Sequence, residues 1–296
     1  MPSLQIAANR RGIAFMSLSM ASFIVNDALV KHVADSLPGP QLIFIRGLFS
    51  SVMLLMVAVV TGALRGASTS ADSSNLRLLF EGRVMSRAAM DALATMVYLT
   101  SLFHLPIGDA TAINMATPLV ISVIAAVVLR ERISGPRWLA ITLGFVGVLL
   151  VVQPAATTFN AWALLCLAGT LLGAIRDLLT RSIHAHVSSV LITLSTVVAT
   201  CLLAGAMAAL AQEWHAVSLE QYALLGVAAV FLSIAYYLLI LSLRVGEMSV
   251  VSPFRYSALL FALLAGWVIW GDIPNLLAWL GITLLVGAGL YMLRLR

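Results

Sequence analysis

Charged residues are scarce in this chain. They make up 10% of its 296 residues, whereas 61% are hydrophobic and the mean hydropathy is +1.05. A soluble domain carries about a quarter charged residues, so this sequence has too little polar surface to cover a soluble core. Nearly every stretch between charge clusters reaches the roughly 20 apolar residues that cross a hydrocarbon layer of about 30 Å. The composition predicts a polytopic helical membrane protein.

Cysteine and catalytic motifs are also nearly absent. Cys166 and Cys201 both fall within apolar segments, which argues against a disulfide framework or a zinc site. The sequence contains no Gly-x-Ser-x-Gly, His-Glu-x-x-His or glycine-rich phosphate-binding motif. Its net charge of +5 is spread over short loops, without a basic patch for nucleic acid. We therefore expect no enzyme, no cofactor, no metal site and no nucleic-acid partner.

What the sequence does contain is a series of long apolar segments. Ten membrane spans fit, at 12–33, 40–61, 85–105, 109–129, 136–153, 161–181, 188–211, 220–243, 249–270 and 275–293. The connection 62–84 is the longest, and we expect a short interfacial helix around 76–80. The apolar run after Arg10 and Arg11 lacks an Ala-x-Ala type cleavage site, so it is predicted to remain as the first span.

The distribution of cations predicts the orientation. With the N-terminus inside, 14 of the 17 Lys and Arg residues fall on the inner side, and cations in short loops stay cytoplasmic. Both termini are therefore predicted to be cytoplasmic in a multi-pass protein of a bacterial inner membrane. Acidic Asp35, Asp109 and Asp272 fall on the outer side.

The chain divides into two related halves, 1–153 and 154–296. The matching segments are Asn26–Lys31 with Arg176–Arg181, Tyr98 and Gly108-Asp109 with Tyr236 and Gly246-Glu247, and Trp138–Leu143 with Trp279–Leu284. Because each half has an odd number of spans, the second half enters the membrane from the opposite side. The predicted fold is an all-α membrane protein with ten transmembrane helices, arranged as two inverted five-helix repeats.

Proline, glycine and charged residues recur near the ends of the two halves. They are Pro118 with the run to Leu129–Arg132, Gly144 and Gly147, and then Pro253–Ser257, Trp270–Asp272, Gly281, Gly287 and Gly289. On these motifs the chain resembles EamA-type members of the drug/metabolite transporter superfamily over nearly its whole length. Asp272 stands where that family usually has glutamate. The resemblance implies a carrier whose central cavity is lined mainly by spans 1, 3, 4, 6, 8 and 9.

Ionisable residues within spans are candidates for function because their burial in lipid is costly. Asp27 and Arg46 both lie about six residues, or roughly 9 Å, from the outer ends of spans 1 and 2. They form either a structural ion pair or a pair bordering the cavity, in which one member releases the other to bind substrate or a proton. Lys31 is expected to reach the outer interface as an anchor.

A second set of charges lies toward the inner side. Asp177 and Arg255 have similar depths in spans 6 and 9, and Arg255 is the favoured substrate contact because a guanidinium binds a carboxylate bidentately. Arg176 is interpreted as a topology cation, and Asp91 as the salt-bridge partner of Arg87.

Uncharged candidates complete the predicted site, and they are Asn26, Tyr98, Asn114, Tyr236 and Tyr256. Tyr98 and Tyr236 correspond in the repeat and are predicted to line the cavity. Asn114 precedes Pro118, which frees a backbone carbonyl, and it either caps a broken helix or contacts the ligand.

A secondary carrier is the leading function, ahead of an intramembrane enzyme and a channel. A cavity with both Asp and Arg suits a zwitterion, which favours export of an amino-acid-like compound or an amino-acid-derived metabolite, including metal-chelating ones. The alternative is import of a vitamin or nucleoside-like solute, such as riboflavin or S-adenosylmethionine. The expected partners are that solute, the bilayer and, in a coupled mechanism, protons. The Gly169-x-x-x-Gly173 spacing fits a monomer or a weak homodimer.

Overall fold

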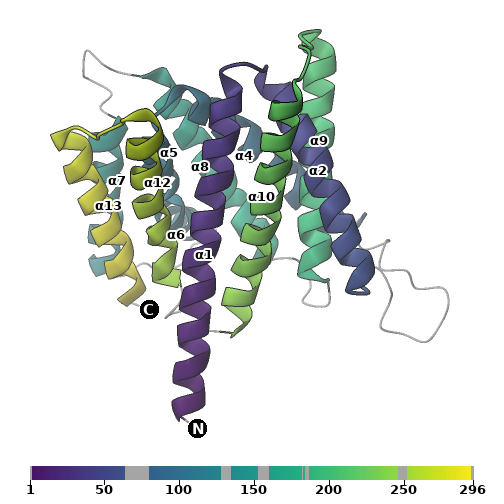
Figure 1. The fold of residues 1–296 in the computed structure, drawn as a ribbon. Coiled ribbons are helices and arrows are strands. Elements are labelled where there is room, and N and C mark those ends of the chain that lie inside the picture. The colour runs from purple at the N-terminus through teal and green to yellow at the C-terminus, as the bar shows by residue number, and fades with distance from the viewer. Residues whose placement is uncertain are drawn as a thin grey trace.

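The protein is a bundle of helices that run up and down with both termini at the same end (Figure 1). The computed structural model describes residues 2–63, 80–127, 135–152, 160–181, 183, 187–245 and 252–294. Within these ranges all regular structure is helical. The predicted interfacial helix around 76–80 falls outside them, apart from Phe80.

Helices occupy all ten predicted spans. They are α1 (Pro2–Ala34), α2 (Gly39–Val60), α4 (Gly82–His104), α5 (Ile107–Asn114), α6 (Thr117–Val127), α7 (Gly135–Val152), α8 (Ala161–Arg181), α9 (Ser189–Ala211), α10 (Leu219–Val245), the 3₁₀ helix η1 (Ser252–Tyr256), α12 (Ser257–Trp270) and α13 (Leu276–Arg294). Five of them, α1, α2, α8, α9 and α10, are long and apolar enough to cross a membrane. The first span is longer than predicted, because α1 begins at Pro2.

The fourth predicted span is two helices rather than one. Pro118 has no N–H to donate to the carbonyl four residues earlier. That carbonyl belongs to Asn114, and α5 ends at Asn114. The Thr117 hydroxyl donates to that freed carbonyl at 2.7 Å. The break at residues 115–116 therefore keeps its backbone hydrogen-bonded, as apolar surroundings require.

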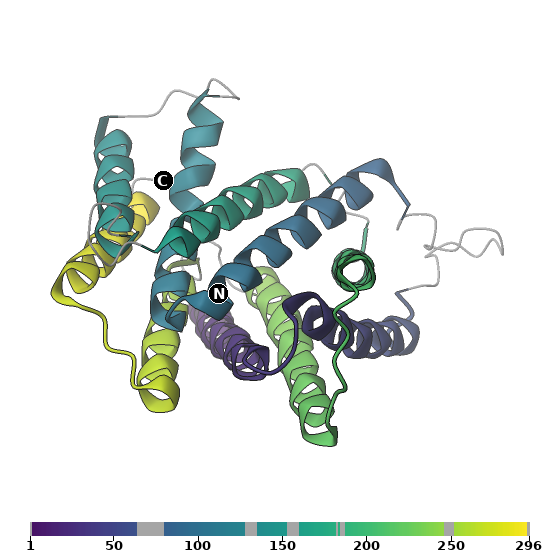
Figure 2. The ribbon, with the colours of Figure 1, turned by 90° about the horizontal axis from the view of Figure 1, so that it is seen from above.

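The helices are arranged in pairs about a central group (Figure 2). Helices α7 and α13 pack together at one end of the bundle, and α2 and α9 pack together at the other. Between these pairs lie α1 against α10 and α4 against α8, with α12 beside α1 and α5. Asp27, Asp91 and Asp177 lie on these central helices, whereas Arg46 lies on α2 of a neighbouring pair.

Apolar side chains cover the outside of this bundle. Val52, Leu202, Leu260 and Trp267 are each more than half exposed, and soluble monomers rarely expose apolar patches of large extent. Such a surface is suited to contact with lipid acyl chains.

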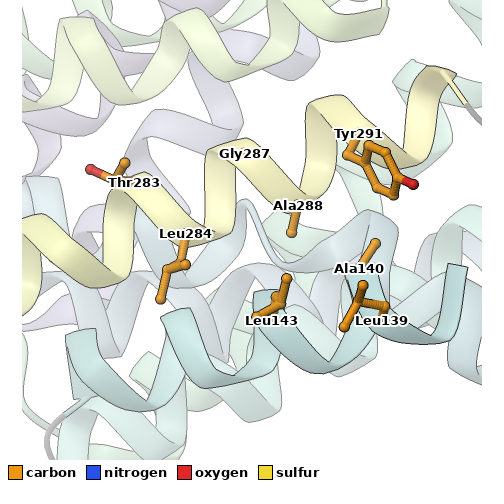
Figure 3. A pocket seen from close by; sticks show the side chains of 8 residues that line it. All are labelled: Leu139, Ala140, Leu143, Thr283, Leu284, Gly287, Ala288 and Tyr291. Atoms are coloured by element: carbon orange, nitrogen blue, oxygen red, sulfur yellow. The ribbon is translucent and has the colours of Figure 1, made fainter. Parts of the chain in front are cut away.

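The peripheral pair α7 and α13 crosses at two glycines. A Cβ added to Gly147 would lie 2.7 Å from the Gly281 carbonyl oxygen, and one added to Gly281 would lie 2.5 Å from the Gly147 carbonyl oxygen. Farther along the same pair, the helices leave a groove of about 250 Å³ lined by side chains such as Leu143 and Leu284 (Figure 3). Gly287 borders this groove, and a Cβ there would meet nothing within 4 Å.

These two glycines of α13 give a matched test of the packing. We expect Gly281→Ala to force the two backbones apart and to lower stability by about 1–3 kcal/mol, the usual cost of overpacking. Gly287→Ala adds the same methyl group into open space and should melt like the wild type. Thermal unfolding of the purified protein in detergent measures both, and equal melting temperatures would contradict the crossing at Gly147 and Gly281.

Candidate functional site

The polar centre of the bundle is built around Asn26 of α1. Arg46 of α2 donates from Nη1 to the Asn26 side-chain oxygen at 3.2 Å, and the Asn26 side-chain nitrogen donates to Asp27 Oδ1 at 2.9 Å. Asn26 is 1% exposed and Arg46 is 4% exposed. The structure thus brings Asp27 and Arg46 together, as neighbours joined through an amide rather than as a direct ion pair.

Tyr98 of α4 holds the other side of the Asp27 carboxylate. Its hydroxyl donates to Asp27 Oδ2 at 3.3 Å. Helix α4 is positioned here by close contact with α8, since a Cβ added to Gly169 would lie 3.2 Å from the Tyr98 backbone nitrogen. A small residue at the crossing allows the two helices to approach.

Tyr236 of α10 lies near Arg46 and also near a second set of charged residues on α4 and α8. Its ring meets the ring of Phe23 edge-on, with centroids 5.2 Å apart. It interacts electrostatically with Arg46 and also with Asp91 and Arg176. Tyr98 and Tyr236, which correspond in the predicted sequence repeat, therefore both lie beside the central charges.

Arg176 is the hub of a second charge network, on α8. Its Nη1 donates to Asp91 Oδ1 at 2.8 Å, and its Nε and Nη2 donate to Asp177 Oδ1 at 3.0 and 2.8 Å. Arg87 approaches Asp91 to 3.6 Å and donates to the hydroxyls of Thr180 and Thr196. The interpretation of Asp91 as the partner of Arg87 is confirmed, but it is incomplete.

The interpretation of Arg176 as a mere topology cation is wrong. Its position near the end of a span resembles that of such cations, yet it ties α4 to α8 through the 1% exposed Asp91. Two signals in the sequence point to this network, namely the Arg87–Asp91 spacing of four residues on one helix face and the carboxylate of Asp177 directly after Arg176.

Arg255 and Tyr256 follow one another in η1 but have different surroundings. Arg255 is partly exposed and interacts electrostatically with Asp177 and Arg176. Tyr256 packs against α13, where its hydroxyl oxygen fills the place that a Cβ of Gly289 would take. Asn114, the remaining candidate, ends α5, and its backbone carbonyl accepts the Thr117 hydroxyl.

Lys31 ties three helices together near the end of the bundle opposite the two termini. Its Nζ donates to the Leu105 carbonyl, directly after α4, and lies 5.1 Å from the centroid of the Trp270 ring on α12. It also interacts electrostatically with Asp272 and Asp109. The predicted role of a simple interfacial anchor is therefore too narrow, because Lys31 makes contacts within the protein.

The network around Arg176 gives a direct stability test. Arg176→Gln leaves the buried Asp91 carboxylate and Asp177 without their main partner, and breaking a buried ion pair costs about 3–5 kcal/mol. We expect a clear fall in the melting temperature of the purified protein. Adding Asp91→Asn should restore part of the loss, whereas Arg294→Gln, at the exposed end of α13, should change little. A wild-type melting temperature for Arg176→Gln would show that the network is not needed for the fold.

Comparison with known proteins places this arrangement in a family. The EamA-like transporter family matches residues 10–153 and again residues 160–294. A solved crystal structure that covers 98% of both chains has the same fold, with a TM-score of 0.66 at 16% identity.

Three curated relatives carry functional names. A riboflavin transporter of Rhizobium johnstonii is 29% identical over 74% of this chain and 72% of its own length. An S-adenosylmethionine uptake transporter of Rickettsia bellii is 25% identical over 95% and 93%. The pseudopaline exporter CntI of Pseudomonas aeruginosa is 23% identical over 97% of each chain. These names indicate transporters rather than enzymes, and the two family matches together cover nearly the whole sequence. This multi-pass membrane protein belongs to the EamA-like transporter family.

Proposed function

We propose that the protein is a secondary transporter that exposes a central site alternately to the two sides of the membrane. The observation that carries the proposal is the polar cluster of Asn26, Asp27, Arg46 and Tyr98, which joins α1, α2 and α4 inside the spans and in which Asn26 and Arg46 are buried. Charged groups within membrane spans mark pathways for substrates or ions. No enzyme chemistry is needed to account for such a cluster.

The pattern of helix packing supports two inverted repeats, 1–153 and 154–296. Helix α1 packs on α10 as α8 packs on α4, so the first helix of each half contacts the third helix of the other. The second helices, α2 and α9, pair with each other, and so do the fifth helices, α7 and α13. The two family matches divide the chain at the same place. Inverted halves give a carrier two related states with opposite openings.

Two sets of contacts fit the role of gates. Toward the outer end, Lys31 joins α1 to Leu105 and to Trp270 of α12. Toward the inner end, Arg176 joins α8 to Asp91 of α4. Alternating access requires one set to separate while the other holds, since a central site open to both sides would leak.

The proposed substrate is a small amino-acid-like zwitterion. The central cluster offers a cation and an anion that are not neutralised by direct contact, and Tyr98 and Tyr236 suit an amphiphilic body. S-adenosylmethionine, named for the Rickettsia relatives, carries such a head group.

The relatives are named for uptake and for export, in keeping with a carrier whose net flux follows gradients. Export is the direction favoured from the sequence, and uptake is the alternative.

Substrate and direction can be measured together by comparing metabolites in cells that lack or overproduce the protein. We expect one solute with both an amino and a carboxylate group to change oppositely inside and outside the cell. Depletion inside on overproduction indicates export, and accumulation inside indicates uptake. Proteoliposomes then confirm that the purified protein moves it. If the shifting solutes lack either group, the zwitterion assignment fails. If no solute moves, the transport function itself fails.

The proposed orientation, with both termini cytoplasmic in a bacterial inner membrane, rests on Arg10, Arg11 and Arg294 near the termini, which share one end of the bundle. We expect a C-terminal green fluorescent protein fusion to fluoresce and a C-terminal alkaline phosphatase fusion to be inactive. An active phosphatase fusion at the C-terminus would contradict the orientation.

A further inference from the structure

We propose that Arg46 and Asp27 bind the carboxylate and the ammonium of an α-amino-acid head group, and that the Asn26 side chain takes the place of this head group in the empty protein. The proposal rests on the transport function proposed above. It goes further by assigning each end of the substrate to one residue, and it moves the carboxylate site from Arg255 to Arg46.

The Asn26 amide has a fixed polarity between the two charges. Its oxygen accepts from the Arg46 guanidinium and its nitrogen donates to the Asp27 carboxylate. This is the only orientation in which the amide fits, because arginine offers donors and a carboxylate offers acceptors. An α-amino acid has the same polarity over a similar distance, with an acceptor carboxylate beside a donor ammonium. The two protein charges are therefore already spaced for such a head group.

Arg46 has hydrogen-bonding capacity that Asn26 does not use. A guanidinium has five N–H donors in a rigid fork that matches a carboxylate. Arg46 uses Nη1 for Asn26, whereas its buried Nε has no hydrogen-bond partner among the described residues. A buried donor without a partner costs free energy. A carboxylate that binds along the Nε edge would supply the missing acceptor, after a movement that opens this edge to the ligand.

Asp27 differs from Asp91 and Asp177 in its hydrogen-bond partners. In the part of the chain that the structure describes, its carboxylate accepts hydrogen bonds from the neutral groups of Asn26 and Tyr98, and Arg46 acts on it only electrostatically. Asp91 and Asp177 are both engaged by Arg176. Asp27 thus remains able to bind a substrate ammonium, and the donors already present fix its orientation.

Arg255 is less suited to a zwitterion for the same reason. The carboxylate in its electrostatic surroundings is Asp177, which accepts two donor nitrogens of Arg176. A substrate carboxylate at Arg255 would therefore leave the substrate ammonium without an unpaired acidic partner nearby. At Arg46 both ends of the head group find a partner, and Phe23 and Tyr236 lie close for the substrate body.

The test is a binding measurement on the purified full-length protein in lipid nanodiscs. The probes are the twenty common amino acids and S-adenosylmethionine, each compared with its methyl ester and with its deaminated acid. Ligand binding stabilises the folded state by RT ln(1 + [L]/Kd), so the shifts in melting temperature at one ligand concentration rank the affinities of all compounds in one assay. The variants are Arg46→Lys, Arg46→Gln and Asp27→Asn, with Arg255→Lys as the matched control.

We expect crossed losses of selectivity. The wild type should prefer at least one free amino acid over both analogues by about 10–100-fold, the value of a hydrogen bond to a charged group. Arg46→Lys and Arg46→Gln should lose the preference over the methyl ester, and Asp27→Asn should lose the preference over the deaminated acid. Arg255→Lys should keep both preferences. The assignment would be overturned if Arg255→Lys lost the preference for the free amino acid over the methyl ester and Arg46→Lys retained it.

A second readout uses the wild-type protein and is independent of variant folding. Phenylglyoxal modifies arginine side chains, and mass spectrometry locates the modified positions. The bound amino acid should protect Arg46 and leave the reactivity of Arg255 unchanged, whereas protection of Arg255 alone would refute the proposal. Absence of binding by every zwitterion, in a protein whose proteoliposomes move another solute, would also refute it while leaving the transport function intact.

Discussion

The central constraint on this structure is the cost of keeping charged groups inside a membrane bundle. Arg46 and Asp27 interact electrostatically but are not in direct contact, because the Asn26 amide accepts from the Arg46 guanidinium and donates to the Asp27 carboxylate. A direct ion pair would be the simpler way to stabilise two opposite charges. The amide bridge leaves each charge without an oppositely charged hydrogen-bond partner, as the proposed ligand site requires.

The rest of the helix arrangement positions this bridge. Helices α1, α2 and α4 supply its residues, and α8 and α10 pack on α4 and α1 from the other half of the chain. Arg176 then fixes α4 to α8 by its ion pair with Asp91, while Lys31 connects α1 to α12 at the opposite end. Helices α7 and α13 stand apart and meet through Gly147 and Gly281. They support the bundle without contributing to the cluster.

Hydropathy was enough to locate the ten helical ranges, because lipid requires continuous apolar helices with satisfied backbones. The number of residues from the predicted ends of spans 1 and 2 also indicated that Asp27 and Arg46 lie at the same depth. Depth does not give the direction of a side chain around its helix, so the bridging position of Asn26 could not be predicted. The role of Arg176 was missed because a cation near the end of a span resembles a topology signal, and its partner Asp91 lies 85 positions away. Pro118 made a broken helix one of two alternatives at Asn114, and the structure shows the break together with its repair by Thr117.

The most direct test of the central claim is a substrate-bound structure determined by electron cryomicroscopy in nanodiscs. The account predicts that the substrate carboxylate contacts the Nε edge of Arg46 and that its ammonium contacts Asp27, with Asn26 displaced from one or both. A ligand bound at Arg255, with the Arg46–Asn26–Asp27 bridge unchanged, would contradict it.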